Sequence, residues 1–169
     1  MDAESSPRYR RRAVATVRAA TPRDAEAIWQ VHTDSIRVLC RERYGSVEIA
    51  AWIAVRDPES YRLAMRSREL FVAERERAIV GFGQLDSRRG EVEACYVAPD
   101  AVGSGVGSAL LARMEEVARQ LGHASLRLNS TLNAEPFYAS RGYRRLGSAI
   151  HRVSPKVELA CVRMEKTFS

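Results

Sequence analysis

Three glycines at alternate positions, Gly103, Gly105 and Gly107, lie between an expected strand at 91–97 and an expected helix at 105–121. The helix is predicted because apolar residues recur along it at helical spacing, and a glycine follows its last turn. A second expected strand comes directly after the helix. A strand, a helix and a strand in this order indicate a parallel crossover, so we expect a mixed α/β fold.

The remaining elements are expected on both sides of this unit. They are strands at 15–19, 70–73, 78–83, 125–129, 150–153 and 157–164, helices that begin near 21, 46 and 57, and a short helix at 135–140. Thr21, Ser46 and Asp57 are typical residues for helix starts. A chain of 169 residues can bury one substantial core, and no long linker divides it. We therefore expect one domain at 13–169.

The net charge of +6 comes partly from the first twelve residues. Within 1–12, four arginines outweigh Asp2 and Glu4 by +2, which leaves +4 for the rest of the chain. We interpret 1–12 as a disordered basic tail, because arginines beside serine and proline are typical of a solvated end. Nucleic-acid binding by the tail is the disfavoured alternative. The remaining positive charge suits a polyanionic small ligand equally well.

Apolar runs and cysteines suggest where the protein resides. No apolar run approaches the roughly 20 residues that cross a bilayer, and no apolar signal core opens the sequence. Cys40, Cys95 and Cys161 are odd in number and lack metal-ligand spacing. We therefore expect a cytoplasmic protein with reduced thiols, no membrane contact and no metal.

The glycine-rich loop has the composition of a phosphate cradle. Glycine allows close approach of the backbone to a ligand, and a helix start offers unpaired N–H groups with a positive dipole end. A P-loop is excluded because no lysine is present in the loop. A dinucleotide fold fits poorly, because five residues precede the first glycine and the next strand ends at Asn129 rather than at an acidic residue. A plain flexible turn remains the alternative.

Two segments of the sequence resemble the GNAT superfamily of N-acetyltransferases. The first is Tyr-Val-Ala-Pro-Asp at 96–100, followed by Val-Gly-Ser-Gly-Val-Gly-Ser-Ala-Leu-Leu at 102–111. The second is Asn-Ala-Glu-Pro-Phe-Tyr at 133–138, followed by Arg-Gly-Tyr at 141–143. Both lie at the spacing of the family, and the order of elements agrees along nearly the whole chain after the tail.

The resemblance implies a twisted central sheet, flanked by helices and splayed at its fourth strand, with acetyl-CoA in the gap. The backbone of Cys95, Tyr96 and Val97 would pair with the pantetheine arm. The amides of the loop would hold the pyrophosphate, and the residues concerned are Gly103, Ser104, Gly105, Val106, Gly107 and Ser108. Pro99 lacks a ladder donor, which suits a strand that leaves its sheet.

The chain departs from the family pattern at two positions. Val102 stands where the family commonly has Gln or Arg, so a side-chain contact to the coenzyme is lost. Thr131 stands where the family often has Asn, and Asn133 is the candidate replacement.

Acyl transfer to an amine requires a proton acceptor for the ammonium group and a proton donor for the departing thiolate. By resemblance, Tyr138 is the donor, and packing against Phe137 is the alternative. Glu91 and Glu93 are the candidate bases, because side chains alternate along a strand and both would share one face with Cys95. We rank Glu93 first, since it lies closer to the expected thioester. A solvated strand face is the competing interpretation.

Other residues have weaker claims to a function. His32 is expected in the first helix, partly buried, although a family acceptor site forms nearby. Tyr44 and Trp52 flank the second helix start and could contact a substrate or pack in the core. Cys95 could act as a nucleophile, but a buried strand cysteine is usually inert.

We therefore expect an N-acetyltransferase that moves an acetyl group from acetyl-CoA to a primary amine by direct attack in a ternary complex. The acceptor would be an amine-bearing small molecule, protein or peptide, which the sequence does not identify. A non-catalytic acyl-CoA-binding or sensor module on the same fold is the alternative. A homodimer is among the expected assemblies, because C-terminal strands often mediate dimers in the family.

Overall fold

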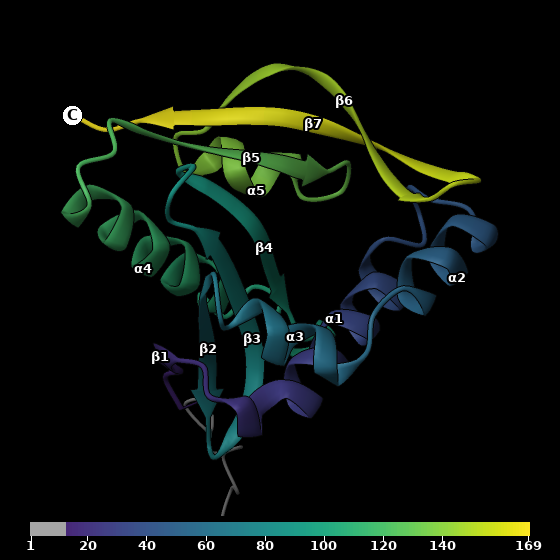
Figure 1. Cartoon of the computed structure of the whole chain (residues 1–169), viewed down its shortest axis with the longest axis horizontal. Coiled ribbons are helices and arrows are strands. Elements are labelled where there is room, and N and C mark those ends of the chain that lie inside the picture. Colours follow the sequence, from purple (N-terminus) through teal and green to yellow (C-terminus); the bar gives the residue numbers. More distant parts are fainter. Residues whose placement is uncertain (1–12) are drawn as a thin grey trace, which may run out of the picture.

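The computed structural model describes residues 13–169, so the expected basic tail at 1–12 lies outside the described residues. The described residues form a sheet of seven strands. Figure 1 shows helices on both sides of it. The elements in chain order are β1 (Thr16–Ala19), η1 (Pro22–Asp24), α1 (Ala25–Leu39), α2 (Ser46–Ala54), α3 (Pro58–Ala64), β2 (Glu69–Arg75), β3 (Ala78–Asp86), β4 (Glu91–Val97), η2 (Pro99–Ala101), α4 (Val106–Gln120), β5 (Ser125–Thr131), α5 (Glu135–Ser140), β6 (Arg144–Ser154) and β7 (Val157–Thr167).

The strands form one mixed sheet in the order β1-β2-β3-β4-β5-β7-β6. All neighbours are antiparallel except β4 and β5, which are parallel and joined through α4. These two strands pair only at Glu91 with Arg127 and at Val92 with Leu128. Beyond Val92 they diverge, as Figure 1 shows. The expected α/β sheet, splayed at its fourth strand, is therefore confirmed.

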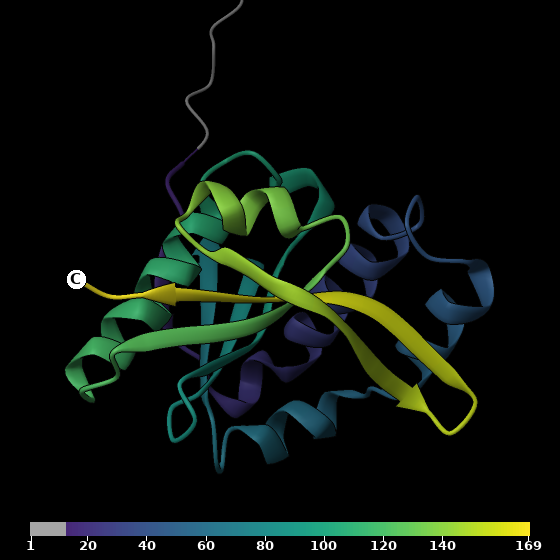
Figure 2. The ribbon, with the colours of Figure 1, turned by 90° about the horizontal axis from the view of Figure 1, so that it is seen from above.

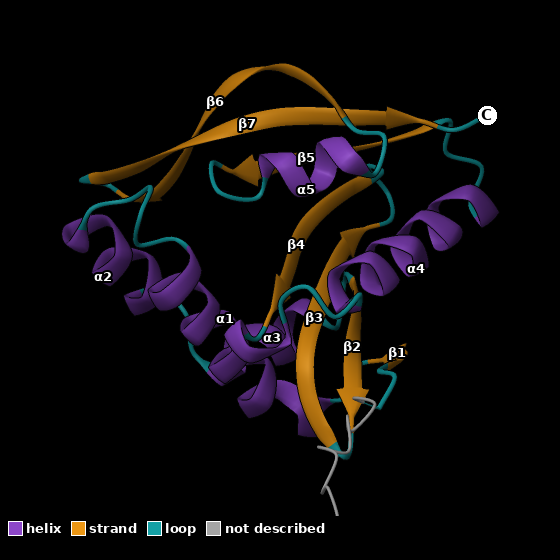
Figure 3. Ribbon diagram, turned by 180° about the vertical axis from the view of Figure 1, so that it is seen from behind, coloured by secondary structure: helices purple, strands orange, loops and turns teal. Residues whose placement is uncertain are grey.

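Helices cover the two faces of β2, β3 and β4. Figure 3 shows α4 on one face and α1 with α3 on the other. The apolar stripe of α4 packs closely because β3 has glycine where the helix crosses it. A Cβ at Gly83 would lie 2.7 Å from the Cε of Met114, and one at Gly81 would lie 2.8 Å from a methyl of Val106. No helix within residues 13–169 is long and apolar enough to cross a membrane.

Local hydrogen bonds explain where the first helices begin. Asp57 precedes Pro58, and its carboxylate accepts from the Ser60 amide at 2.9 Å, as expected for an N-cap. Thr21 behaves differently from the expectation. Its amide and hydroxyl both donate to the carboxylate of Asp24, at 2.8 and 3.2 Å, so the aspartate caps this turn.

The C-terminal hairpin is longer than the sequence indicates. β6 begins at Arg144 rather than near residue 150, and most of its residues are exposed or half-buried. It lies at the edge of the sheet and pairs only with β7, so it needs no apolar alternation. Figure 2 shows the hairpin crossing the molecule, with its turn beside α2.

Candidate active site

Two cavities meet at the gap where β4 separates from β5. We call the first the loop pocket. It has a volume of about 330 Å³, and its walls include Cys95, Gly105 and Tyr138. We call the second the polar pocket. It has a volume of about 340 Å³, and its walls include His32 and Arg56. Both are lined by Val92, Glu93, Ala94, Tyr96, Asn129 and Thr131.

The glycine-rich loop forms one wall of the loop pocket. Gly103 and Gly105 have φ values of 76° and 85°, which favour glycine, and a Cβ at either position would meet nothing within 4 Å. The loop is therefore open on this side. The helix α4 begins directly after it, so its first N–H groups and its positive dipole end lie at the loop. This arrangement can hold a phosphate by backbone alone.

Two residues of the expected cradle have other contacts. The Ser104 amide donates to the carbonyl of Ala101 at 3.3 Å, and the Ser104 hydroxyl donates to the same oxygen. The Val106 side chain is buried in the core. Neither is among the residues that line the loop pocket, whereas Gly103, Gly105, Gly107 and Ser108 line it.

The edge of β4 is partly unpaired along the loop pocket. Cys95, Tyr96 and Val97 pair with β3 on one side. On the other side, pairing with β5 ends at Val92. The outer backbone groups of this stretch can therefore pair with an extended ligand, as a neighbouring strand would.

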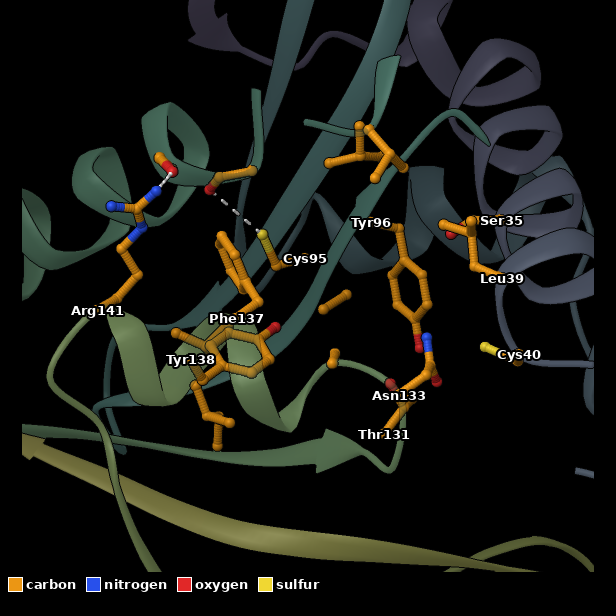
Figure 4. A pocket seen from close by; sticks show the side chains of 18 of the residues that line it. Ser35, Leu39, Cys40, Cys95, Tyr96, Thr131, Asn133, Phe137, Tyr138 and Arg141 are labelled. Carbon is orange, nitrogen blue, oxygen red and sulfur yellow. Dashed lines mark hydrogen bonds between the residues drawn. The ribbon is translucent and has the colours of Figure 1, made fainter. Parts of the chain in front are cut away.

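Tyr138 lies at the centre of the loop pocket wall. It comes from α5, and only 6% of its surface is exposed. Figure 4 shows its hydroxyl on the cavity side, near the Cys95 sulfur. Burial, with the neighbouring Cys95 as a lesser cause, raises the pKa of Tyr138 well above its usual value. The hydroxyl is therefore protonated at neutral pH and is a proton donor.

Arg141 is a site residue that sequence reasoning missed. It ends α5 and lines the loop pocket. Its guanidinium donates to the hydroxyl of Ser108 in the first turn of α4, as Figure 4 shows. A cation thus lies beside the loop in a chain that has Val102 where the family commonly has a polar residue. The sequence signal was present in the Arg-Gly-Tyr segment, which we used only as part of the resemblance to the family and not as a source of a binding residue.

Asn133 also lines the loop pocket. Its side-chain oxygen is buried and has no hydrogen-bond partner within residues 13–169. Thr131, the position where the family often has Asn, borders both pockets.

A β-bulge in β4 corrects the expected orientation of the glutamates. Gln84 of β3 pairs with Ala94, but the next residue, Leu85, pairs with Val92, so Glu93 is an additional residue. The side chains of β4 therefore do not alternate regularly between the two faces of the sheet from Glu91 to Cys95. Val92 packs with Leu85 in the core cluster beneath α4, and Cys95 packs against that same cluster.

The glutamates accordingly face the other side of the sheet, and the expectation that both share a face with Cys95 was wrong. Glu91 pairs with Asp86, whose side chain contacts Arg68, the residue before β2. The carboxylate of Glu93 accepts from Arg68 at 3.0 Å and from Gln84 at 2.6 Å. Both glutamates line the polar pocket.

The two carboxylates differ in their contacts. One oxygen of Glu93 accepts both hydrogen bonds, so this side chain is held in place. The Glu91 side chain has no hydrogen bond or ion pair with any residue between 13 and 169. Of the two, Glu91 is therefore the carboxylate that is free to accept a proton from a ligand in the polar pocket.

Aromatic side chains build the rest of the polar pocket. His32 is 2% exposed and contacts the Tyr61 hydroxyl through Nδ1 at 2.8 Å. Its ring packs against Tyr96 with centroids 4.1 Å apart and ring planes tilted by 38°. Burial, with Arg56 as a second cause, lowers the pKa of His32 well below its usual value. Tyr44 holds the region together, because its hydroxyl donates to the carbonyl of Ala160 and accepts from the Leu132 amide.

Comparison with known proteins identifies the family. A profile of the acetyltransferase (GNAT) domain matches residues 40–168. The chain therefore belongs to the GNAT acetyltransferase family. No curated protein sequence matches the chain significantly.

Solved structures have the same fold. A GCN5-related N-acetyltransferase from Rhodopseudomonas palustris is 26% identical, with a TM-score of 0.86 over 93% of this chain and 98% of that chain. PaiA N-acetyltransferase from Thermoplasma acidophilum, in complex with coenzyme A, is 18% identical with a TM-score of 0.73 over 91% and 99%. The yncA structure from Salmonella typhimurium, with its cofactor acetyl-CoA, is 21% identical with a TM-score of 0.62 over 92% and 95%.

Proposed function

We propose that this acetyltransferase moves an acetyl group from acetyl-CoA to a primary amine by direct attack in a ternary complex. The observation that carries the proposal is the junction of two different cavities at the gap between β4 and β5. The loop pocket has a backbone cradle for phosphate, and the polar pocket has a free carboxylate. Each cavity has the chemistry that one of the two substrates requires.

The loop pocket fits the coenzyme. The open backbone at Gly103 and Gly105 and the first turn of α4 would hold the pyrophosphate, with Arg141 beside them. The free edge of β4 at 95–97 would pair with the pantetheine arm. The buried, unpartnered oxygen of Asn133 would accept a hydrogen bond from the same arm. The bound thioester supplies the acetyl group.

In the net reaction an ammonium group and a thioester give an amide, a thiol and one proton. The C–N bond forms as the C–S bond breaks. Tyr138 gives its proton to the departing sulfur, because its raised pKa keeps it protonated and its hydroxyl lies at the cavity. The ammonium group loses two protons: one passes through a carboxylate of β4 to water, and the other restores the Tyr138 hydroxyl, so that one proton is released overall.

We propose Glu91 as the carboxylate that accepts the amine proton, with Glu93 second. The sequence favoured the opposite order, because Glu93 is closer to the gap. The ion pair between Glu93 and Arg68 supports the reversal, since an engaged carboxylate is less available to a substrate.

Direct transfer is supported by the state of Cys95. Burial raises the pKa of its thiol to about 12, so almost none of it is thiolate at neutral pH. A cysteine in this state is a poor nucleophile, and an acyl-enzyme on Cys95 is disfavoured.

Release of free thiol from acetyl-CoA in the presence of a panel of amines tests the proposal. We expect turnover with at least one amine, intersecting initial-velocity lines, and persistence of turnover in Cys95→Ala. Parallel lines with loss of turnover in this variant would indicate a covalent intermediate. Tight coenzyme binding without turnover for any amine would favour the non-catalytic binding module.

A further inference from the structure

The polar pocket contains a cation that has no anionic partner. Arg56 follows α2 and lines the pocket. Its side chain makes no hydrogen bond or ion pair with any residue in the described part of the chain, and its Nε is buried. An arginine that faces a cavity without a counter-charge is unusual, because burying an unpaired charge is costly.

Two further donors in the same pocket also lack partners. The indole Nε1 of Trp52 and the Nε2 of His32 are buried and have no hydrogen-bond partner within 13–169. Both side chains are nearly inaccessible, with 3% and 2% of their surfaces exposed. The Tyr61 hydroxyl lies 2.8 Å from Nδ1 of His32, a contact whose direction depends on the tautomer of the imidazole, and we assign Tyr61 as its donor. The neutral imidazole then carries its proton on Nε2 and is a donor.

The other ionisable groups that line the pocket do not neutralise this cluster. Glu93 is held by Arg68, and no ion pair joins Glu91 to Arg56. His151 of β6 also lines the pocket, and burial lowers its pKa. The pocket therefore has three unpartnered donors in one region, together with one free carboxylate from β4.

We propose that the acceptor carries a carboxylate, which binds to Arg56 with Trp52 and His32 as further donors. The proposal rests on the proposed function and names the substrate class of its acceptor pocket. The planar guanidinium matches a carboxylate geometrically, and hydrogen bonds between charged groups are the strong ones. The free Glu91 in the same pocket would receive the ammonium group, so the acceptor is an amino-carboxylate.

The size of the polar pocket agrees with a small acceptor. Its volume of about 340 Å³ lies at the lower end of the range for small-molecule sites. Segments that are distant in sequence enclose it, including α1, α2, β4 and β6. An amino acid or a similar zwitterion satisfies both the charge and the size.

The test compares matched amines in the thiol-release assay. The probes are free L-amino acids and their carboxamides, in which a neutral amide replaces the carboxylate. The amide also lowers the pKa of the amine, so kcat/KM is compared per unprotonated amine. The wild-type protein should prefer the carboxylate member of its best pair by about 10- to 100-fold in kcat/KM, the effect of a hydrogen bond to a charged group. The preference should disappear in Arg56→Gln and decrease in Trp52→Phe, which keeps an aromatic ring but removes the N–H.

Controls separate this proposal from the proposed function. Arg62→Gln removes a nearby arginine of α3 that does not line the polar pocket, and it should keep the preference. Calorimetry with coenzyme A checks the loop pocket in every variant. Equal or better turnover of the carboxamides, a preference that survives in Arg56→Gln, or coenzyme binding with no turnover of any amino acid would each overturn the carboxylate assignment. If the wild-type protein did not bind coenzyme A, the proposed function itself would be refuted.

Discussion

The loop pocket and the polar pocket are similar in volume but are built in different ways. The loop pocket has as its longest wall one continuous segment, from β4 through the glycines into α4, and residues of α1, β5 and α5 complete it. The polar pocket uses side chains from at least five separate elements, among them His32, Trp52 and Glu91. A pocket wall made of backbone changes little when side chains are substituted, whereas a pocket made of side chains changes with each substitution.

The difference also explains how each pocket binds charge. In the loop pocket, positive potential comes mainly from the helix start and from the exposed Arg141. In the polar pocket, the positive charge is a single shielded guanidinium among aromatic rings. Substitutions should therefore separate into those that change coenzyme binding and those that change acceptor selection. The following predictions test that separation.

The largest effect is expected for the hydroxyl of Tyr138 in the loop pocket. Tyr138→Phe removes only a hydroxyl, so turnover should fall by about 10²- to 10⁴-fold while coenzyme affinity changes little. Single-turnover kinetics and calorimetry measure the two quantities. Tyr143→Phe is the matched control, because its buried hydroxyl contacts Glu115 and lies outside both pockets. Equal turnover in the two variants would reduce Tyr138 to a packing residue.

The carboxylates of β4 should differ from each other. Glu91→Gln should lower turnover near neutral pH by about 10²-fold, at the lower end for a general base, since a carboxylate is a weak base toward ammonium. Glu93→Gln should have a much smaller effect, because its carboxylate is engaged by Arg68. The pH–rate profiles of both variants decide the order. A larger loss in Glu93→Gln would restore the order that the sequence favoured.

Two glycines at opposite ends of α4 provide a test of the cradle. Gly105 and Gly122 both have a φ of 85° and open space where a Cβ would lie. Valine should destabilise the fold by about 1–2 kcal/mol at either site. Only Gly105→Val should also weaken coenzyme binding, by about 10- to 100-fold, because one or more amide contacts to a charged phosphate are lost. Thermal unfolding measures the stability, and calorimetry measures the affinity for the coenzyme. Equal affinities in both variants would mean that the phosphate does not bind at Gly105.

A smaller effect is expected for the exposed cation of the loop pocket. Arg141→Gln should weaken coenzyme binding by up to about 5-fold, and added salt should reduce the difference, since exposed charge pairs are weak and screened. Arg152→Gln, which removes an exposed partner of Glu158 on the C-terminal hairpin, should leave affinity unchanged. A salt-independent loss in Arg141→Gln would mean that the side chain acts through Ser108 rather than through its charge.

The smallest effect on function is expected for the capping aspartate, which lines neither pocket. The bonded Arg18 lowers the pKa of Asp24 from 3.8 to about 2. The pair therefore stabilises the fold above pH 3.8, and this stability is lost as pH falls through about 2. Asp24→Asn should cost about 1–2 kcal/mol at pH 7, with coenzyme binding unchanged. Denaturant unfolding at pH 7 and below pH 3 measures it, and an equal cost at both pH values would exclude the linkage.

The sequence by itself determined most of the fold and one pocket. The apolar periodicity of α4, the glycines before it and the strand on each side are local signals, and together they predicted the α/β class and the phosphate cradle. The length of the C-terminal hairpin was harder to predict from the sequence. Its strand β6 lies at the edge of the sheet, and its exposed residues need no alternation of apolar and polar side chains. Arg141 was missed because its function depends on its distance to a loop more than 30 residues away.

Only the tertiary structure decided the polar pocket. The bulge at Glu93 turns both glutamates toward α1 and α3, and a rule of strict alternation cannot anticipate an additional residue. Arg56, Trp52 and His32 have no common sequence motif, and they converge only because α1 and α2 pack against the splayed sheet. Backbone conformation follows from neighbouring residues, so a short motif was enough to predict a glycine loop before α4, and the phosphate that it would hold stays a prediction. The meeting of distant side chains follows from long-range packing, which no local pattern records.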